Sequence, residues 1–371
     1  MFRRTFLGAA AVAACFSFVV MPTTAQAKPI TDVLGRTVQV PDDPQRILLG
    51  FYFEDFYAIG GAQAYDRVVA ISRATWEGWR NSQWTRYVAK TPHIADLIDV
   101  GEIDSGTFSI ETAVAAKPDV AIFAAWQFNA LGDGVAKLEA AGIPVVVADY
   151  NAQTVEKHVA STHMLGALLG GDAEQRGNTL AASYQAAVAD VQARVAAAGG
   201  TAPKVYVELG SKGPDEYGNS YGKGMWAGVI ETAGGENIAK GQVGAWGPLN
   251  PEYVIASNPD VILLAGSDWL GRDKAVIMGF GQTADVTSAR MQPYTERPGW
   301  SGIGAVNTGE VHAVYHGGTR TLYDFTFLQY IAKVLYPDAF ADVDPMANLQ
   351  AYYNEYLPIE ASGVFMQKMG D

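Results

Sequence analysis

Aromatic and arginine side chains gather in the segments that follow the predicted strands of this chain. Large rigid aromatic rings stack on flat organic molecules, and guanidinium groups bind anions through charge-assisted hydrogen bonds. In open α/β sheets, ligands bind beyond the carboxyl ends of the strands. We therefore expect a site for a flat or anionic organic ligand, lined by Tyr52, Arg73, Trp76, Trp79, Arg80, Trp126, Tyr221, Trp226, Trp246, Trp269, Tyr315, His316 and Arg320.

The 5 histidines form no compact set of metal ligands in the sequence. His158 and His163 diverge on a helix, and His312 and His316 lie roughly 13 Å apart if that segment is extended. A bare metal ion is therefore not the expected ligand. A metal held in a chelate, such as Fe³⁺, could still accept Tyr315 or His316, because a phenolate oxygen suits a hard ion. We expect no cofactor apart from this ligand.

Ser220 lies in a Gly-x-Ser-x-Gly sequence, which raises the alternative of an exported serine hydrolase. Asp260 and either His312 or His316 follow in the order of a catalytic triad. A nucleophile elbow needs a strand that enters the turn directly, whereas residues 210–214 separate the predicted strand from the serine. We therefore expect a binding protein and not an enzyme.

The charge balance argues against a nucleic-acid partner. Lys and Arg number 26 against 39 Asp and Glu in the 371 residues, which gives a formal net charge of −13. A strongly acidic protein repels a phosphate backbone. The single cysteine, Cys15, lies in an N-terminal apolar run, so no disulfide is predicted in the remainder of the chain.

Residues 1–27 have the pattern of a secretory signal peptide. Arg3 and Arg4 precede an apolar run, and Ala25-Gln26-Ala27 is a small-x-small cleavage site, with cleavage expected after Ala27. The two arginines also resemble a twin-arginine signal, so that export route stays open. Residues 12–15 resemble a lipoprotein box, but bulky Phe16 follows and favours soluble release instead. No later run reaches the roughly 18 apolar residues of a membrane helix.

Short apolar strands alternate with helical stretches, which predicts two α/β lobes with parallel sheets. A segment from Glu111 to Val120 recurs 141 residues later, from Glu252 to Val261, and each copy reads as a short helix, a Pro-Asp turn and a buried strand. A leading hairpin turns at residues 34–36 and ends with a strand at 37–40. The main strands are expected at residues 46–50, 67–71, 120–124 and 143–148 in the first lobe, and at 204–209, 261–265 and 310–314 in the second.

A long helix is predicted between the lobes, at residues 173–198 with Asp172 as its N-cap. It would be roughly 39 Å long, enough to cross the back of both lobes as a strut. We expect an N-terminal lobe at residues 28–150, connecting helices at 151–200 and a C-terminal lobe at 201–371.

Several segments resemble the periplasmic binding proteins that serve ABC importers of ferric siderophores, haem and cobalamin. They are residues 31–47, the two Glu-to-Pro-Asp segments, and residues 142–146, 234–239 and 300–311. The resemblance implies the class III fold of this family: α/β, with two Rossmann-like lobes of parallel-rich sheets joined by one long connecting helix. It also implies that a ligand binds between the lobes and that Glu111 and Glu252 meet arginines of the permease.

We accordingly expect a periplasmic solute-binding protein that captures a metal chelate, most simply a ferric siderophore. It would deliver this ligand, as a monomer, to an inner-membrane ABC permease and its ATPase. The stiff connecting helix should keep lobe closure small. Haem, cobalamin, a free metal ion or an oxyanion remain alternative ligands.

Overall fold

The computed structural model of the chain describes residue 1 and residues 27–371. The predicted signal peptide therefore lies almost wholly outside the described residues. Ala27, the residue that precedes the expected cleavage point, begins strand β1 (Ala27–Thr31). Within residues 27–371, no helix is both long enough and apolar enough to cross a membrane.

The first lobe is built on a five-stranded sheet in which every strand pair is parallel. Its order is β5-β4-β3-β6-β7, and the strands are β3 (Ile47–Leu49), β4 (Val68–Ile71), β5 (Ile98–Asp99), β6 (Val120–Ala124) and β7 (Val145–Ala148). The helices of this lobe are α1 (Phe53–Gly60), α2 (Asn81–Lys90), α3 (Ile110–Ala115), α4 (Ala125–Leu131) and α5 (Asp133–Ala140). The predicted hairpin is present as β1 and β2 (Thr37–Pro41).

The second lobe contains another five-stranded sheet, with the order β10-β8-β12-β14-β16. Its strands are β8 (Lys204–Leu209), β10 (Glu236–Asn237), β12 (Val261–Gly266), β14 (Val311–Tyr315) and β16 (Met366–Lys368), of which only β16 runs antiparallel to its neighbour. Two small ladders pair β9 (Asn219–Tyr221) with β11 (Trp246–Pro248) and β13 (Gly279–Phe280) with β15 (Gly363–Val364). The helices are α8 (Met225–Thr232), α9 (Pro251–Ser257), α10 (Ala284–Thr295), α11 (Gly304–Thr308), α12 (Asp324–Leu335) and α13 (Pro345–Tyr356). Every main strand predicted from the sequence is present.

The repeated segment forms the same joint in both lobes. In the first lobe it is α3 and β6, and the Asp119 carboxylate accepts the backbone N–H of Arg46, just before β3. In the second lobe it is α9 and β12, and the Asp260 carboxylate accepts the backbone N–H of Lys204, the first residue of β8. Each aspartate thus fixes the start of the neighbouring central strand. This shared role explains why the Pro-Asp pair recurs.

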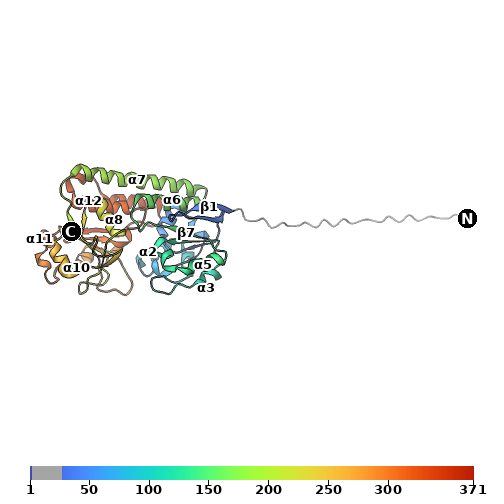
Figure 1. The fold of residues 1–371 in the computed structure, drawn as a ribbon, viewed down its shortest axis with the longest axis horizontal. Helices are drawn as coiled ribbons and strands as arrows, with labels where there is room; N and C mark the ends of the chain where they lie inside the picture. The colour runs from blue at the N-terminus through green and yellow to red at the C-terminus, as the bar shows by residue number, and fades with distance from the viewer. Residues whose placement is uncertain (2–26) are drawn as a thin grey trace.

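Two helices connect the lobes, α6 (Val155–Leu169) and α7 (Asp172–Ala198). The 27 residues of α7 span about 40 Å, and Figure 1 shows this helix lying along the top of both lobes. It packs on α1 and α6 at one end and on α12 at the other. One face of α7 is buried through Leu180, Tyr184, Val188 and Val191. The predicted strut is therefore confirmed.

Candidate functional site

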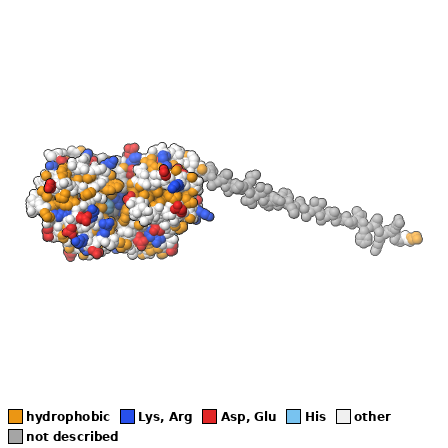
Figure 2. All heavy atoms as spheres, turned by 60° about the horizontal axis from the view of Figure 1, so that its bottom comes forward, with side chains coloured by type: hydrophobic (Ala, Val, Ile, Leu, Met, Phe, Trp, Pro, Cys, Tyr) orange, Lys and Arg blue, Asp and Glu red, His pale blue; other side chains and the backbone are white. Residues whose placement is uncertain are grey.

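A cleft of about 510 Å³ lies between the lobes, at the ends of their strands. The first lobe supplies residues that follow β3 and β6 or precede α2, and the second supplies residues that follow β12 and β14 or belong to β9 and β11. Figure 2 shows basic and apolar side chains close together along the junction of the two lobes. The volume falls in the range of ordinary small-molecule sites.

Many of the residues expected from the sequence line this cleft. The first lobe contributes aromatic rings that contact one another: the Trp79 and Trp126 centroids are 6.5 Å apart and stacked, and Phe51 meets Trp126 edge to face at 5.7 Å. The expected residues that the structure brings together here are Trp79, Arg80, Trp126, Tyr221, Trp246, Trp269, His316 and Arg320.

Three expected first-lobe residues lie outside the cleft lining. Trp76 is fully buried, stacks on Phe53 and donates its indole N–H to Gln83 at 2.8 Å. Tyr52 is buried and donates its hydroxyl hydrogen to another side chain at 2.7 Å. Arg73 donates to two backbone carbonyls at the end of the η3 turn (Pro92–Asp96). Each of these side chains is therefore used within the lobe and supports the cleft from behind.

Two expected second-lobe residues also lie outside the lining. Tyr315 is fully buried, and its hydroxyl has no hydrogen-bond partner. Gly317 seals this ring from the cleft: a Cβ at that position would come within 2.3 Å of the Tyr315 ring. Burial raises the pKa of the phenol, which opposes a phenolate ligand. Trp226 is fully buried as well, but its indole N–H donates to His316 Nδ1 at 3.1 Å.

Other residues line the cleft beyond the expected set, namely Phe51, Ala74, Gly78, Asp104, Asn151, Leu209, Ser211, Asn219, Met225, Ser267, Leu270, Arg272 and Gly317. Some of them could have been identified in the sequence because they come after a strand: Phe51 follows β3, and Leu270 and Arg272 follow β12. Asp104 and Ala74 lie in irregular segments whose course is set by tertiary packing.

Positive charge dominates the floor of the cleft. Arg80 and Arg320 are only 8% and 6% exposed, and their guanidinium carbons lie 5.6 Å and 5.3 Å from the centroid of the Phe51 ring. Burial, with a contribution from Arg80, lowers the pKa of Arg320 to about 10. Burial and the two arginines lower the pKa of His316 well below its usual value, so its imidazole is neutral at neutral pH. The cleft therefore presents guanidinium charge and a neutral histidine.

Buried carboxylates join the lobes behind the cleft. Glu54, at the start of α1, accepts hydrogen bonds from Tyr323 at 2.6 Å and Tyr353 at 3.0 Å in the second lobe, and from Gln83 and Tyr87 in the first. Burial raises the pKa of Glu54. The two tyrosines of the second lobe therefore hold the lobes against each other at Glu54.

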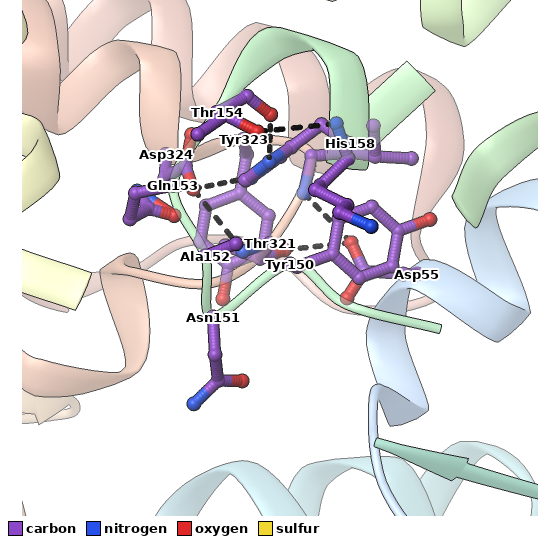
Figure 3. A network of polar contacts seen from close by, with 12 residues as sticks. Asp55, Tyr150, Asn151, Ala152, Gln153, Thr154, His158, Thr321, Tyr323 and Asp324 are labelled. Carbon is purple, nitrogen blue, oxygen red and sulfur yellow. Dashed lines mark hydrogen bonds and ion pairs between the residues drawn. The ribbon is translucent and has the colours of Figure 1, made fainter. Parts of the chain in front are cut away.

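A second part of this junction appears in Figure 3. Asp55 accepts hydrogen bonds from the Thr321 hydroxyl at 2.9 Å and the Leu322 backbone N–H at 2.7 Å. His158 on α6 contacts Asp324 on α12 at 2.9 Å, and both side chains are almost completely buried. Several buried polar contacts therefore join the lobes within a largely hydrophobic core, which is consistent with a stiff connection.

Ser220 is not arranged as a nucleophile. It lies on β9, which pairs antiparallel with β11, and its buried hydroxyl has no hydrogen-bond partner. Asp260 is engaged by Lys204 at the start of β8, and His312 is bonded to Glu310 and Tyr330. His316 contacts Trp226 and Arg320, so no hydrogen bond links Ser220 to Asp260 or to either histidine of the alternative triad.

No group of three or more potential metal-ligating His, Cys, Asp or Glu side chains occurs among residues 27–371.

The two glutamates expected to meet the permease are exposed in equivalent places. Glu111 lies in the first turn of α3 and Glu252 in the first turn of α9. Helix N-caps by Ser109 and Asn250 fix these turns.

The chain is similar to known proteins along most of its length. A family model described as "Periplasmic binding protein" matches residues 47–314. The crystal structure of the TroA-like periplasmic binding protein FepB from Veillonella parvula has a TM-score of 0.84 and 33% sequence identity, and the match covers 92% of this chain and 99% of that one. A search of curated proteins gave no match.

Two more distant structures share the fold. The molybdate-bound periplasmic protein MolA from Haemophilus influenzae has a TM-score of 0.69 and 19% identity over 91% of this chain and 99% of that one. The periplasmic heme-binding protein RhuT from Roseiflexus sp. RS-1 has a TM-score of 0.57 and 20% identity over 80% of this chain and 99% of that one. At these identities the likeness concerns the fold alone.

Proposed function

The chain belongs to the periplasmic binding protein family, and we propose that it captures an anionic metal chelate, a ferric siderophore, in the cleft between its lobes. Its fold is the class III fold of this family, with two parallel-rich α/β lobes and a long connecting helix. Members of the family are periplasmic, bind small molecules and work with the permeases of ABC transporters. Export through a signal peptide cleaved after Ala27 and delivery of the chelate to such a permease complete the proposal.

Two unpaired buried guanidinium groups carry the proposal for an anionic ligand. Neither Arg80 nor Arg320 forms an ion pair with any carboxylate of residues 27–371, and Arg320 Nε is buried without an acceptor. Glu54, a buried carboxyl whose charge interacts with that of Arg80, is already bonded by four other side chains. An unpaired buried charge is costly, and a bidentate anion relieves that cost. A carboxylate or catecholate oxygen of the ligand fits this requirement.

The walls of the cleft favour an organic ligand over a small oxyanion. The cleft that contains the two guanidinium groups is also lined by the aromatic side chains of Trp79, Trp126, Trp246, Trp269 and Tyr221. Trp246 is 51% exposed at the rim, where an apolar ring gains most by covering a ligand. A molybdate-sized ion would leave most of the 510 Å³ and these rings unused. An aromatic or flat chelate uses both features.

A preformed chelate also fits better than a bare metal ion. The described residues offer no cluster of metal ligands, Tyr315 is sealed beneath Gly317, and His316 Nδ1 is occupied by Trp226. The ligand must therefore bring its own coordination sphere. Haem would satisfy this partly, but of the two axial candidates in the cleft, Tyr221 has a phenol whose pKa is raised by burial and His316 has its Nδ1 occupied by Trp226.

Tryptophan fluorescence tests the proposal directly, because several indole rings line the cleft. We expect ferric tris-catecholate or ferric citrate to quench the emission of the purified protein in a saturable manner, and haem, cyanocobalamin and molybdate to quench it weakly or not at all. Saturable quenching by cobalamin or molybdate alone would refute the anionic ferric chelate as the ligand.

Substitution of the arginines supplies a sharper test. Arg320→Met and Arg80→Met should each weaken chelate binding by roughly tenfold to a hundredfold, because hydrogen bonds to charged groups contribute about 1.5–3 kcal/mol. Arg320→Met should also raise the melting temperature of the unliganded protein, since it removes a buried charge whose pKa burial has lowered to about 10. Arg194→Met on the outer face of α7 is the control and should leave affinity unchanged. Unchanged affinity in both cleft variants would refute the assigned role.

A further inference from the structure

The buried contact between Trp226 and His316 determines which ring nitrogen of His316 carries the proton. Trp226 is fully buried, and its indole N–H, which can only donate, points at His316 Nδ1 at 3.1 Å. This is the only hydrogen bond that the indole makes among the described residues. His316 Nδ1 must therefore act as the acceptor. A neutral imidazole then carries its hydrogen on Nε2.

Arg320 could also donate a hydrogen bond to His316, but we expect the bond from Trp226 to form instead. Its Nη1 lies 3.3 Å from His316 Nε2, and a guanidinium nitrogen can also only donate. One neutral imidazole accepts only one of these two hydrogen bonds. The Trp226 donor is fully enclosed and pays the whole desolvation cost if left alone. Arg320 lines the cleft, so its planar guanidinium group can instead donate to solvent or to a ligand.

We propose that Trp226 is a positioning residue which holds His316 as the Nε2–H tautomer, so that His316 and Arg320 offer two adjacent donors to a single acceptor oxygen of the ligand. The part that concerns the ligand rests on the proposed function. The tautomer itself does not, because it follows from contacts within the protein.

Three further observations support a donor pair that is incomplete without a ligand. Arg320 Nε is buried and lacks an acceptor. The backbone of Arg320 has φ +59° and that of Met225, beside it in the lining, has φ +43°. Left-handed backbone at non-glycine residues costs of order 1–3 kcal/mol and gathers at functional sites. His316 also lies beside two aromatic rings, with centroid distances of 6.2 Å to Tyr221 and 6.3 Å to Trp269.

The proposal separates two classes of ligand by chemistry. A chelate that presents a peripheral carboxylate or catecholate oxygen meets both donors at once. A ligand whose iron or nickel ion has an open coordination position would need a histidine lone pair, but Nε2 is already protonated. Trp226 thus selects for a ligand oxygen and against direct metal coordination by His316.

Nuclear magnetic resonance of the ligand-free protein tests the tautomer. Long-range ¹H–¹⁵N correlations at neutral pH report which imidazole nitrogen is protonated, and His316→Gln identifies the signals of this residue among the 5 histidines. We expect the Nε2–H form. A spectrum with the Nδ1–H form or a doubly protonated ring in the wild-type protein would overturn the inference, whatever the ligand proves to be.

Trp226→Phe removes the indole N–H while keeping an aromatic ring. We expect His316 to move toward the Nδ1–H form and the affinity for ferric citrate or ferric tris-catecholate to fall roughly tenfold. Trp300→Phe is the matched control, because Trp300 is equally buried and donates to Tyr217 at 2.7 Å, away from His316. It should change neither the tautomer nor the affinity.

The two readouts separate failure of this inference from failure of the proposed function. If no chelate binds to the wild-type protein, the proposed function and the ligand-bridging step are both refuted, whereas the tautomer is judged by the spectrum alone. If chelate binds and Trp226→Phe changes the tautomer without weakening binding, the donor role of His316 is refuted and the proposed function stands.

Discussion

Asp55 should make the stability of the protein depend on pH in an unusual direction. Its side chain is 3% exposed at the junction of the lobes, where it accepts hydrogen bonds from Thr321 and Leu322. Burial, opposed by these hydrogen bonds and supported by the nearby Glu54 charge, raises the pKa of Asp55 from 3.8 to about 7. Most paired carboxylates stabilise a fold as the pH rises, whereas this one should destabilise it.

The sign follows from proton uptake. Between pH 3.8 and about 7 the folded carboxyl holds a proton that the unfolded chain has released. Folding therefore binds a proton in this window, and the contribution of Asp55 to the free energy of unfolding falls as pH rises. It is fully present below pH 3.8 and lost above about pH 7. At about 1.4 kcal/mol per pH unit, the two units between pH 5 and pH 7 amount to about 3 kcal/mol.

Urea unfolding of the wild-type protein and of Asp55→Asn at pH 5 and pH 8 measures this contribution. Asparagine keeps an oxygen that can accept the hydrogen bonds of Thr321 and Leu322 but does not titrate. From pH 5 to pH 8, the free energy of unfolding of the wild-type protein should fall by about 3 kcal/mol relative to that of Asp55→Asn. Asp96→Asn, at an exposed position, should follow the wild-type protein. Equal pH dependence in wild type and Asp55→Asn would refute the reasoning.

Three further outcomes can be measured. Glu111→Arg or Glu252→Arg should sharply reduce chelate uptake by cells while leaving the dissociation constant of the purified protein unchanged, because both residues are exposed and neither belongs to the cleft lining. A change in affinity would contradict a docking role. Glu208→Gln should lower the free energy of unfolding by about 3–5 kcal/mol in urea, because Arg297 would lose a buried bidentate carboxylate at 2.6 Å and 2.9 Å; a loss below about 1 kcal/mol would contradict it. A fluorophosphonate probe should not label Ser220, which is buried and has no base beside it, and mass-spectrometric detection of the adduct would reopen the hydrolase alternative.

Much of the fold could be predicted because its signals are local. Apolar runs such as residues 120–124 and 204–209 mark strands with the observed bounds. The absence of breakers also indicates the long helix, which runs from Asp172 to Ala198 and ends before Gly199. The predicted N-cap was wrong by one residue, because Gly171 is the N-cap and Asp172 is the first residue of the helix without a side-chain cap hydrogen bond. The repeat makes Pro118-Asp119 equivalent to Pro259-Asp260. In the structure both aspartates accept a backbone N–H at the start of a neighbouring strand.

The contents of the cleft could be predicted as a set but not residue by residue. Trp76 and Trp79 belong to one segment, yet Trp76 stacks on Phe53 inside the lobe while Trp79 lines the cleft. Tyr315 and His316 are adjacent, and only His316 reaches the cleft. The direction of a side chain beyond a strand end depends on the partners that pack against it, and the sequence does not name those partners.

By itself, the sequence determined the alternation of strands and helices, the duplicated joint and the length of the connecting helix, since hydrophobic period, turn residues and helix breakers act over a few neighbouring positions. Only the tertiary structure decided which charges stay unpaired and which donors meet. Tyr323 and Tyr353 reach Glu54 across 269 and 299 residues, and Trp226 reaches His316 across 90. Such pairs form because a polar group buried without a partner is costly, and the folded chain determines which partner is near.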